Sequence, residues 1–380
     1  MKNRKIKIAA VLLAAAMAVA MFAGCSKQEQ PAGSTEEESL TQEEKKAETL
    51  NVGIYNGSYL AVSVLVAREM GYFEQEGLEI NWENVSGDGT AMVATGDLDI
   101  YTSGVNSVLT SVAAGETGVY IASGLMSEGC DYVAQKDFKL DELKSAKDFE
   151  GLSIAACASD PGLLWTKDYL QKAGVEAEFV EFGSISESLS AVQKGECEIG
   201  IICGASSYEA LLSGNCKVLA QVVDFIGTFP CCRVQVSEKL VHENSEQLVK
   251  FMRAQLRGYE TYRNEPEKVG EILSEISGQD ASICIAKMYD SDAYDTPMTV
   301  GIDPDTDAII ASYQKLKDIG IIDADTKYNI EDNLYIDAYG TALKQLQQEE
   351  PDNQLWIELE ERFEKNNSQL LAAKQAGENE

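Results

Sequence analysis

The hydrophobic pattern of residues 50–104 switches repeatedly between the two-residue period of a strand and the longer period of a helix. The run LNVGIY alternates as a strand does, and apolar residues then follow at helical spacing at Leu60, Val64, Ala67 and Met70. The runs LEINWENV and LDIYTSG give two further strand patterns. The pattern therefore predicts strand, helix, strand, helix, strand, with a third helix beginning at Val105.

Small polar residues separate each of these strands from the helix that follows it. The turns are Asn56-Gly57-Ser58, Ser86-Gly87-Asp88 and Ser103-Gly104. Strands that alternate with helices form a largely parallel sheet through right-handed crossovers, so the three turns should lie at one edge of that sheet. Helix N-termini at this edge leave backbone N–H groups unpaired, and a small solute can accept from them.

The same arrangement returns in the middle of the chain. The strand patterns LSIAACA, AEFVEFG and CEIGIICG each lead into a small polar turn, and residues 195–199 (GECEI) echo residues 96–100 (GDLDI). A chain of 380 residues with 44% hydrophobic composition is long enough for two lobes with a substantial core. We therefore expect two α/β lobes of similar design.

The segments AREMGYFEQEGLEI and GDLDI, in this order and spacing, resemble the nitrate/sulfonate/taurine family of transporter substrate-binding proteins. The resemblance covers residues 50–343 and implies the type II periplasmic-binding-protein fold: two lobes, each with a central, mostly parallel sheet flanked by helices, and a ligand cleft between them. On this basis we expect lobe one at 49–137 and 236–345, lobe two at 138–235, and a C-terminal helical extension at 346–380 with a disordered end.

The amino terminus resembles the signal of a bacterial lipoprotein. Four basic residues precede an apolar run at 8–22 that is short for a membrane span, and the run ends in Phe22-Ala23-Gly24-Cys25. This resemblance implies a signal peptide at 1–24 and lipidation of Cys25, followed by a flexible acidic linker that completes 25–48. The alternative is an uncleaved signal anchor. Either reading predicts a membrane-attached protein on the extracytoplasmic face.

The charge of the chain argues against nucleic acid as a partner and limits the kinds of solute that we expect. Acidic residues outnumber basic ones by 63 to 31, so no basic surface for nucleic acid is expected. Beside the candidate cleft turns the sequence places the acids Asp88, Glu128, Asp131 and Asp160, against the bases Arg68 and Arg233. The balance favours a neutral, zwitterionic or cationic solute, although backbone N–H groups can also bind an anion.

The parts of an active site or a metal centre are missing from the sequence. His242 is the only histidine, no C-x-x-C pair occurs, and no phosphate loop or catalytic triad is visible. Apart from Cys25, most cysteines lie in apolar strand patterns, which favours buried thiols over disulfides. We expect no cofactor, no metal and no enzymatic activity.

The candidate ligand-contacting residues are those of the strand-end turns and the aromatic residues beside them. They are Asn56, Gly57, Ser58, Tyr59, Ser86, Gly87, Asp88, Ser103, Gly104 and Asn106 in lobe one, and Ser159, Asp160, Ser184, Gly204, Ser206 and Tyr208 in lobe two. Each polar residue could instead cap a helix, and each aromatic residue could belong to the core. The family commonly carries a Trp-Glu-Pro-like segment where this chain has CGASSY, so no known ligand is carried over.

The resemblance implies a monomeric solute-binding lipoprotein that closes two lobes on a small organic solute and delivers it to the permease of an ABC transporter and its ATPase. Two alternatives stay open. One is a surface protein that senses a similar ligand, and the other is a secreted enzyme.

Overall fold

The computed structural model describes residues 49–55, 59–86, 89–127, 129–158, 160–289 and 299–377. The chain divides into the units Met1–Lys46 and Ala47–Glu380, and every described residue lies in the second unit. The predicted signal peptide, the lipidated Cys25 and most of the linker fall outside the described residues. Within the described part of the chain, no helix combines the length and apolarity needed to cross a bilayer.

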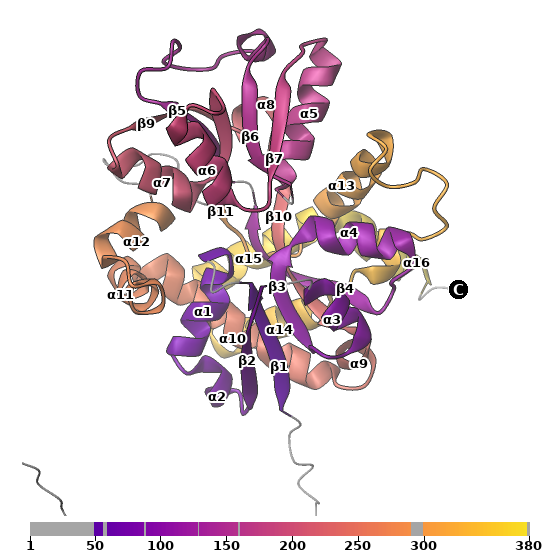
Figure 1. Cartoon of the computed structure of the whole chain (residues 1–380). Helices are drawn as coiled ribbons and strands as arrows, with labels where there is room; N and C mark the ends of the chain where they lie inside the picture. The colour runs from indigo at the N-terminus through magenta and orange to yellow at the C-terminus, as the bar shows by residue number, and fades with distance from the viewer. Residues whose placement is uncertain are drawn as a thin grey trace, which may run out of the picture. The chain divides into compact units, whose positions relative to one another are not determined.

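Two sheets form the centres of two lobes, which we name by their sheets (Figure 1). Lobe one holds six strands in the order β11-β4-β10-β3-β1-β2, with bounds β1 (Leu50–Tyr55), β2 (Ile80–Val85), β3 (Ile100–Gly104), β4 (Val119–Ser127), β10 (Pro230–Ser237) and β11 (Thr299–Val300). Lobe two holds five strands in the order β7-β6-β8-β5-β9, with bounds β5 (Cys130–Gln135), β6 (Ser153–Cys157), β7 (Glu178–Phe182), β8 (Ile199–Cys203) and β9 (Cys216–Gln221).

Both sheets are mixed, so the prediction of mostly parallel pairing is met only in part, and the short strand β11 also pairs antiparallel with β4. In lobe one, β1 pairs in parallel with β2 and β3, and β10 runs antiparallel between β3 and β4. In lobe two, β6 pairs in parallel with β7 and β8, and β5 runs antiparallel between β8 and β9. The α/β fold expected from the alternation of strands and helices is therefore confirmed.

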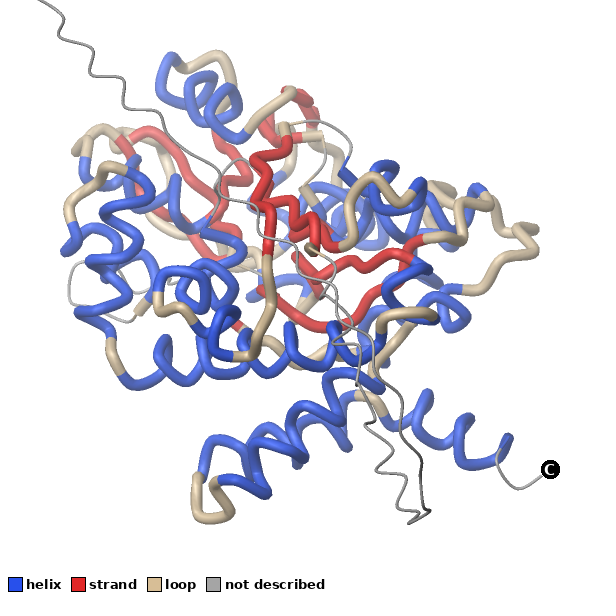
Figure 2. The backbone as a smooth tube through the Cα atoms, turned by 90° about the horizontal axis from the view of Figure 1, so that it is seen from below, coloured by secondary structure: helices blue, strands red, loops and turns tan. Residues whose placement is uncertain are grey.

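Helices cover both sheets, as the tube view shows (Figure 2). Those of the first half are η1 (Tyr59–Ala61), α1 (Val62–Glu69), α2 (Tyr72–Gln75), α3 (Gly89–Thr95), α4 (Val105–Ala114), η2 (Ala146–Phe149), α5 (Pro161–Ala173), α6 (Ile185–Lys194), α7 (Gly204–Leu212) and α8 (Val223–Ile226). Those of the second half are α9 (Glu238–His242), α10 (Ser245–Asn264), α11 (Pro266–Ser277), α12 (Ala281–Met288), α13 (Thr306–Asp318), η3 (Ile330–Asn333), α14 (Asp337–Glu349), α15 (Gln354–Asn366) and α16 (Ser368–Gly377).

The longest helix, α10, packs closely on α1 because a glycine lies at their contact. A Cβ atom added at Gly258 would collide with the carbonyl oxygen of Ser63 and lie 2.9 Å from Ala67 Cβ. Below this crossing the Phe251 ring lies 4.9 Å from the Phe73 ring, which in turn lies 5.3 Å from Trp82. Helix α10 is thereby fixed to lobe one, and α11 and α12 follow it along the chain.

The lobe boundaries differ from those expected from the sequence. Strand β5 was expected in lobe one, but it pairs with β8 and β9 of lobe two, so the first crossing lies between Ser127 and Cys130. Strand β10 begins at Pro230 and pairs with β3 and β4 of lobe one, so the chain returns before residue 236. A run of apolar strand residues does not reveal which sheet it joins, because buried strands of either sheet have the same composition.

The two crossings run through neighbouring strands. The chain leaves lobe one at the end of β4 and returns at the start of β10, and these two strands pair with each other. In lobe two the strands that receive and release the chain, β5 and β9, also pair with each other.

The C-terminal extension is helical, as expected, and it packs on lobe one. Its helices α15 and α16 bury Trp356 and Leu359, and α14 lies between α15 and α10. Residues 378–380, where the disordered end was predicted, lie outside the described residues.

Candidate functional site

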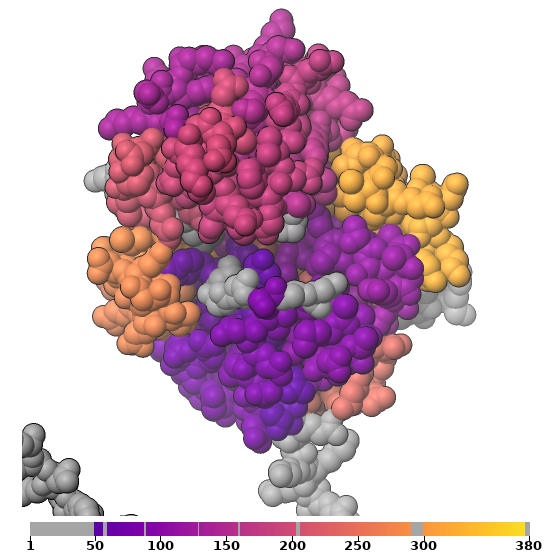
Figure 3. Space-filling view, in the orientation of Figure 1, coloured from indigo at the N-terminus to yellow at the C-terminus, as the bar shows by residue number. Residues whose placement is uncertain are grey.

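The turns predicted to hold a ligand lie at the ends of parallel strands in both lobes. Residues Ser103 and Gly104 end β3, and α4 begins directly after them. In lobe two, β8 runs straight into α7 at Gly204. Between the lobes the space-filling view shows a hollowed surface, bordered on one side by the orange residues of α11 and α12 (Figure 3).

Several predicted residues lie outside the part of the chain that the structure describes: Asn56, Gly57, Ser58, Gly87, Asp88 and Ser159. For these the prediction stays a prediction. Of the others in lobe one, Ser86 is exposed just after β2, while Ser103, Gly104 and Asn106 are half-buried.

Asn106 carries a buried polar atom without a hydrogen-bond partner among the described residues. Its Oδ1 atom is buried and accepts no hydrogen bond within the described chain. Nearby, the Gly104 carbonyl accepts from Ser107 Oγ at 2.9 Å and from Gln235 Nε2 at 3.4 Å. A buried carbonyl oxygen without a donor is costly, because it loses its bond to water and gains none in return. Asn106 Oδ1 is therefore a position where a donor group on a ligand would be stabilised.

Two candidates of lobe two serve as helix caps. Asp160 is the N-cap of α5, and its Oδ1 atom accepts from the Gly162 N–H at 2.7 Å and from the Cys130 thiol at 3.5 Å. Ser184 is the N-cap of α6, where its Oγ atom accepts from Glu187 N–H at 3.3 Å. The capping alternative that the sequence left open therefore accounts for hydrogen bonds of both residues.

The two candidate tyrosines contact helix α12 rather than an open surface. Tyr208 on α7 is buried and packs against Ala286. Tyr59 donates from its hydroxyl to Gln279 Oε1 at 2.7 Å and lies 3.4 Å from Cys284 Sγ. Burial is the main cause that raises the pKa of Tyr59, and the hydrogen bond with Cys284 raises it further. The hydroxyl therefore keeps its proton.

A polar cluster joins the lobes at this place. Lys287 Nζ on α12 lies 2.7 Å from Glu209 Oε1 on α7, 2.6 Å from Gln279 Oε1, and 5.1 Å from the centre of the Tyr59 ring. Gln279 Nε2 also donates to Glu209 Oε1 at 2.5 Å. We call Tyr59, Glu209, Gln279 and Lys287 the interlobe cluster. Sequence reasoning found Tyr59 only, although a lysine within the apolar run ASICIAKM was a visible signal of a buried charge.

A second contact joins the lobes between α5 and α13. Lys315 Nζ lies 3.2 Å from Asp168 Oδ2 and 4.4 Å from the centre of the Trp165 ring. The same carboxylate also accepts from Lys172 at 3.0 Å within α5. A cavity of about 250 Å³ adjoins this contact, lined by Trp165, Phe229, Ser312 and their neighbours.

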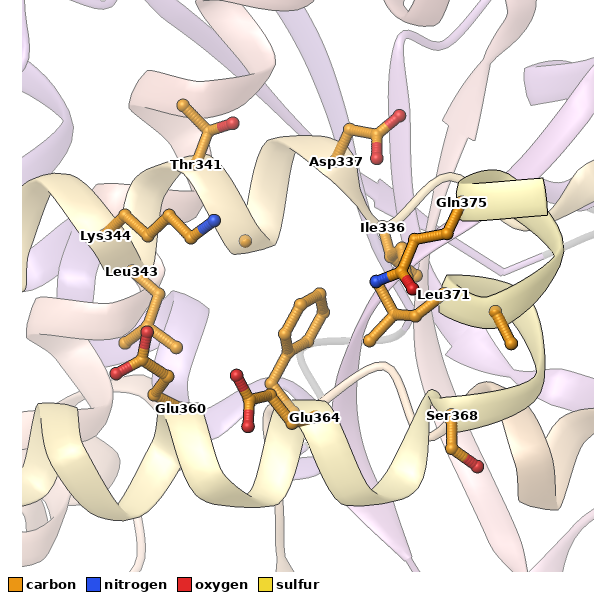
Figure 4. A pocket seen from close by; sticks show the side chains of 13 residues that line it. Ile336, Asp337, Thr341, Leu343, Lys344, Glu360, Glu364, Ser368, Leu371 and Gln375 are labelled. Atoms are coloured by element: carbon orange, nitrogen blue, oxygen red, sulfur yellow. The ribbon is translucent and has the colours of Figure 1, made fainter. Parts of the chain in front are cut away.

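Another cavity lies elsewhere, between α14, α15 and α16, and measures about 670 Å³ (Figure 4). Figure 4 shows side chains of these helices around it, among them Lys344, Glu360 and Glu364. It lies on the C-terminal helices and not at the strand-end turns. The candidate site is therefore the hollow between the lobes.

Comparison with known proteins identifies the fold independently of these residues. The family model described as NMT1/THI5 like matches residues 61–269, more than half of the chain. No curated protein sequence matches the chain.

Three solved structures illustrate the likeness. The nitrate-binding protein NrtA from Synechocystis PCC 6803 superposes with a TM-score of 0.67 and 14% identity, covering 79% of this chain and 89% of its own. The aliphatic sulphonate binding protein SsuA from Escherichia coli superposes with a TM-score of 0.62 and 14% identity, covering 76% of this chain and 92% of its own. The ligand binding component of an ABC-type import system from Staphylococcus aureus superposes with a TM-score of 0.60 and 12% identity, covering 78% of this chain and 99% of its own.

Two of the three are named as binding proteins and one as a ligand binding component, and their likeness to this chain shows its fold. The resemblance seen in the sequence is thus confirmed, and the chain belongs to the NMT1/THI5-like family.

Proposed function

We propose that this protein is an extracytoplasmic solute-binding lipoprotein that closes two lobes on a small organic solute and delivers it to the permease of an ABC importer. The observation that carries the proposal is the pair of lobes joined by two crossings, with polar contacts that reach from one lobe to the other. A solute that touches both lobes favours the closed arrangement by its differential affinity. The proposal places Cys25 in a lipid anchor and the folded unit outside the membrane.

The contacts that Arg233, Arg68 and Lys287 make within the protein support a solute without strong negative charge. Arg233 is fully buried and donates to the backbone carbonyls of Pro304, Met126 and Cys232. Arg68 lies 2.7 Å from Glu69, and Lys287 is committed to the interlobe cluster. Because Arg68 and Lys287 are paired with carboxylates and Arg233 is fully buried, a neutral, zwitterionic or cationic solute that donates to Asn106 Oδ1 fits better than a strong anion.

A thermal-shift screen of the full chain tests the binding claim. Sulfonates, pyrimidines, amines and amino-acid derivatives form the panel, and a ligand at one hundred times its Kd should stabilise the fold by about 2.7 kcal/mol. If no compound shifts the midpoint, the proposed binding function is contradicted.

The best compound then tests the site by calorimetry. Asn106→Ala should weaken its binding by roughly tenfold, the equivalent of about 1.4 kcal/mol. Asn81→Ala is the matched control, because Asn81 is an exposed residue near the opposite end of β2. Equal affinities of the two variants would remove Asn106 from the site.

Lipidation is tested separately. Incorporation of labelled palmitate should be seen in cells producing the natural chain and lost in Cys25→Ser. Palmitate incorporation in the variant would contradict the anchor at Cys25.

A further inference from the structure

Two adjacent cysteines bring their sulfur atoms together at the start of β10. The Sγ atoms of Cys231 and Cys232 lie 3.3 Å apart, and both residues are buried. In a regular strand, neighbouring side chains point to opposite faces of the sheet. The pairing of β10 with β4 shifts register between Pro230 and Cys232 and again between Cys232 and Arg233. Such a bulge redirects a side chain, which explains how both sulfurs reach the same place.

The next residue of the strand, Arg233, is a buried cation. The Arg233 guanidinium donates from Nη1 to the Cys232 carbonyl at 2.8 Å, and its Nη2 has no hydrogen-bond partner among the described residues. Burial lowers the pKa of Arg233, while Asp305, Cys232, Asp303 and Cys231 act in the opposite direction.

Two other buried cysteines of the fold, Cys197 and Cys216, serve for comparison. Burial raises the pKa of the Cys197 thiol, and the nearby Glu178 and Glu196 raise it further. Burial also raises the pKa of the Cys216 thiol. Thiols of this kind are poor nucleophiles at neutral pH, and they provide an internal comparison for the pair at β10.

We propose that Cys231 and Cys232 form a redox-active dithiol that a low-molecular-weight disulfide oxidises to a vicinal disulfide. One thiolate attacks the external disulfide, forms a mixed disulfide and releases one thiolate from the oxidant. The second cysteine sulfur then displaces the other half of the oxidant and closes the Cys231–Cys232 bond. Two thiol protons pass to the two released thiolates, so the protein loses two electrons and two protons, and the oxidant is reduced to two thiols. This site is distinct from solute binding and does not depend on it.

Oxidation would act on the strand through which the chain returns to lobe one. The disulfide closes a small ring that contains the 231–232 peptide bond, so this peptide must reorient. In the β10–β3 register Cys232 pairs with Gly104, and a Cβ added at Gly104 would lie 3.9 Å from the Cys231 carbonyl oxygen. The change therefore reaches the turn at the end of β3, one of the candidate ligand turns.

Peptide mapping of the full chain tests the proposal. The native protein is incubated with oxidised glutathione, quenched with acid, unfolded, alkylated with iodoacetamide and digested with trypsin. Cleavage after Lys217 and Arg233 releases residues 218–233, which contain both cysteines and no other. We expect this peptide unalkylated and lighter by two hydrogen atoms than its reduced form, and we expect dithiothreitol to restore alkylation of both residues. Two alkylated cysteines, or a stable mixed disulfide with glutathione, would overturn the proposal.

Variants separate the pair from the remaining cysteines. Cys231→Ser and Cys232→Ser should each stop at the mixed disulfide, whereas Cys197→Ser should oxidise at 218–233 like the natural chain. If the serine variants fail to fold, phenylarsine oxide on the natural chain gives the second measurement, because trivalent arsenic binds two adjacent thiols. It should protect both cysteines from iodoacetamide under native conditions, and alkylation at the rate of the untreated protein would contradict the dithiol.

Discussion

Lys287 and Glu209 lie on helices of different lobes, and their charged groups meet at 2.7 Å. The Lys287 side chain is fully buried, whereas that of Glu209 is 46% exposed. Helix α12 follows α10 and α11 on lobe one, and α7 belongs to lobe two, so this ion pair bridges the two lobes.

Glu209→Gln should therefore open the protein. Removing one member of a buried ion pair costs roughly 3–5 kcal/mol because a charge stays buried without its partner, and the exposure of Glu209 reduces this to about 1–2 kcal/mol. Small-angle scattering should show a larger radius of gyration than in the natural chain. Lys287→Met is the control and should be milder, since it leaves no unpaired buried charge. An unchanged radius in Glu209→Gln would contradict the role of the pair.

The stability contributed by the ion pair of Lys287 and Glu209 should depend on pH in the acid range. Burial acts to raise the pKa of Glu209, but hydrogen bonds from Lys287 and Gln279 outweigh it and leave the pKa lowered. A lowered carboxyl pKa adds stability above its usual value of 4.5, and that stability is lost as pH falls through the folded value. The difference in midpoint between natural chain and Glu209→Gln, measured by urea unfolding, should be constant near pH 7 and shrink below about pH 4.5. A constant difference down to pH 3 would show that the charge of Glu209 does not stabilise the fold.

The second interlobe contact offers a matched pair of lysines. Lys315 and Lys172 both contact the Asp168 carboxylate, but only Lys315 crosses between lobes and lies over Trp165. Lys315→Ala should cost about 1 kcal/mol of unfolding free energy, because it loses a cation–π contact and an ion pair. Lys172→Ala should cost at most about 0.5 kcal/mol, the value of a helix-surface pair. Equal losses in urea unfolding would argue against the interlobe contribution.

The stability contributed by Asp303 should change with pH in the opposite direction to that of Glu209. It is 4% exposed, and burial raises its pKa to about 6, although hydrogen bonds from Asp305 N–H and Asn366 and the charge of Arg233 act to lower it. Between the usual value of 3.8 and about 6 the folded state binds more protons than the unfolded state. Its contribution is fully present below pH 3.8 and is lost as pH rises through about 6.

Over this window the natural chain should lose roughly 2–3 kcal/mol relative to Asp303→Asn, whose side chain does not titrate. Urea unfolding at pH 4 and pH 7 measures the difference. A parallel response of the two proteins would mean that Asp303 keeps an ordinary pKa.

Asn367 ties the C-terminal extension to lobe one. Its Oδ1 accepts from the Thr306 N–H at 3.0 Å, and its Nδ2 donates to the Phe363 carbonyl at 2.8 Å. Asn367→Ala should cost about 1–3 kcal/mol, since buried backbone groups lose their partners. Asn366→Ala is the control, because its side chain makes a longer 3.4 Å bond to Asp303 from a half-buried position. Thermal unfolding of the two variants should separate them by several degrees, and coincident midpoints would contradict this role.

Local periodicity was enough to predict β1, β2 and β3 of lobe one and β6, β7 and β8 of lobe two, because each of these strand runs ends in residues that favour a turn or a helix cap. Ser184 and Asp160 illustrate this, since both were recognised at helix starts and both are N-caps. The sheet to which β5 belongs could not be predicted, because its pairing with β8 and β9 joins residues far apart in the sequence.

The interlobe cluster could not be predicted as a cluster for the same reason, because its residues lie far apart in the sequence. Tyr59 and Lys287 are separated by more than half of the chain, and neither residue type alone distinguishes a solute contact from a contact between lobes. The register shifts that bring Cys231 and Cys232 together likewise depend on how β10 pairs with β4, which no local pattern encodes.

The paired crossings have a mechanical consequence. Because β4 lies beside β10 and β5 lies beside β9, two adjacent strands share the connection between lobes, and each resists twisting of the other. We therefore expect relative movement of the lobes to be mainly a hinge rotation about these connections. A single distance between spin labels on α7 and α12 should therefore report the whole trajectory of opening, and any compound that holds that one angle should mimic the natural solute.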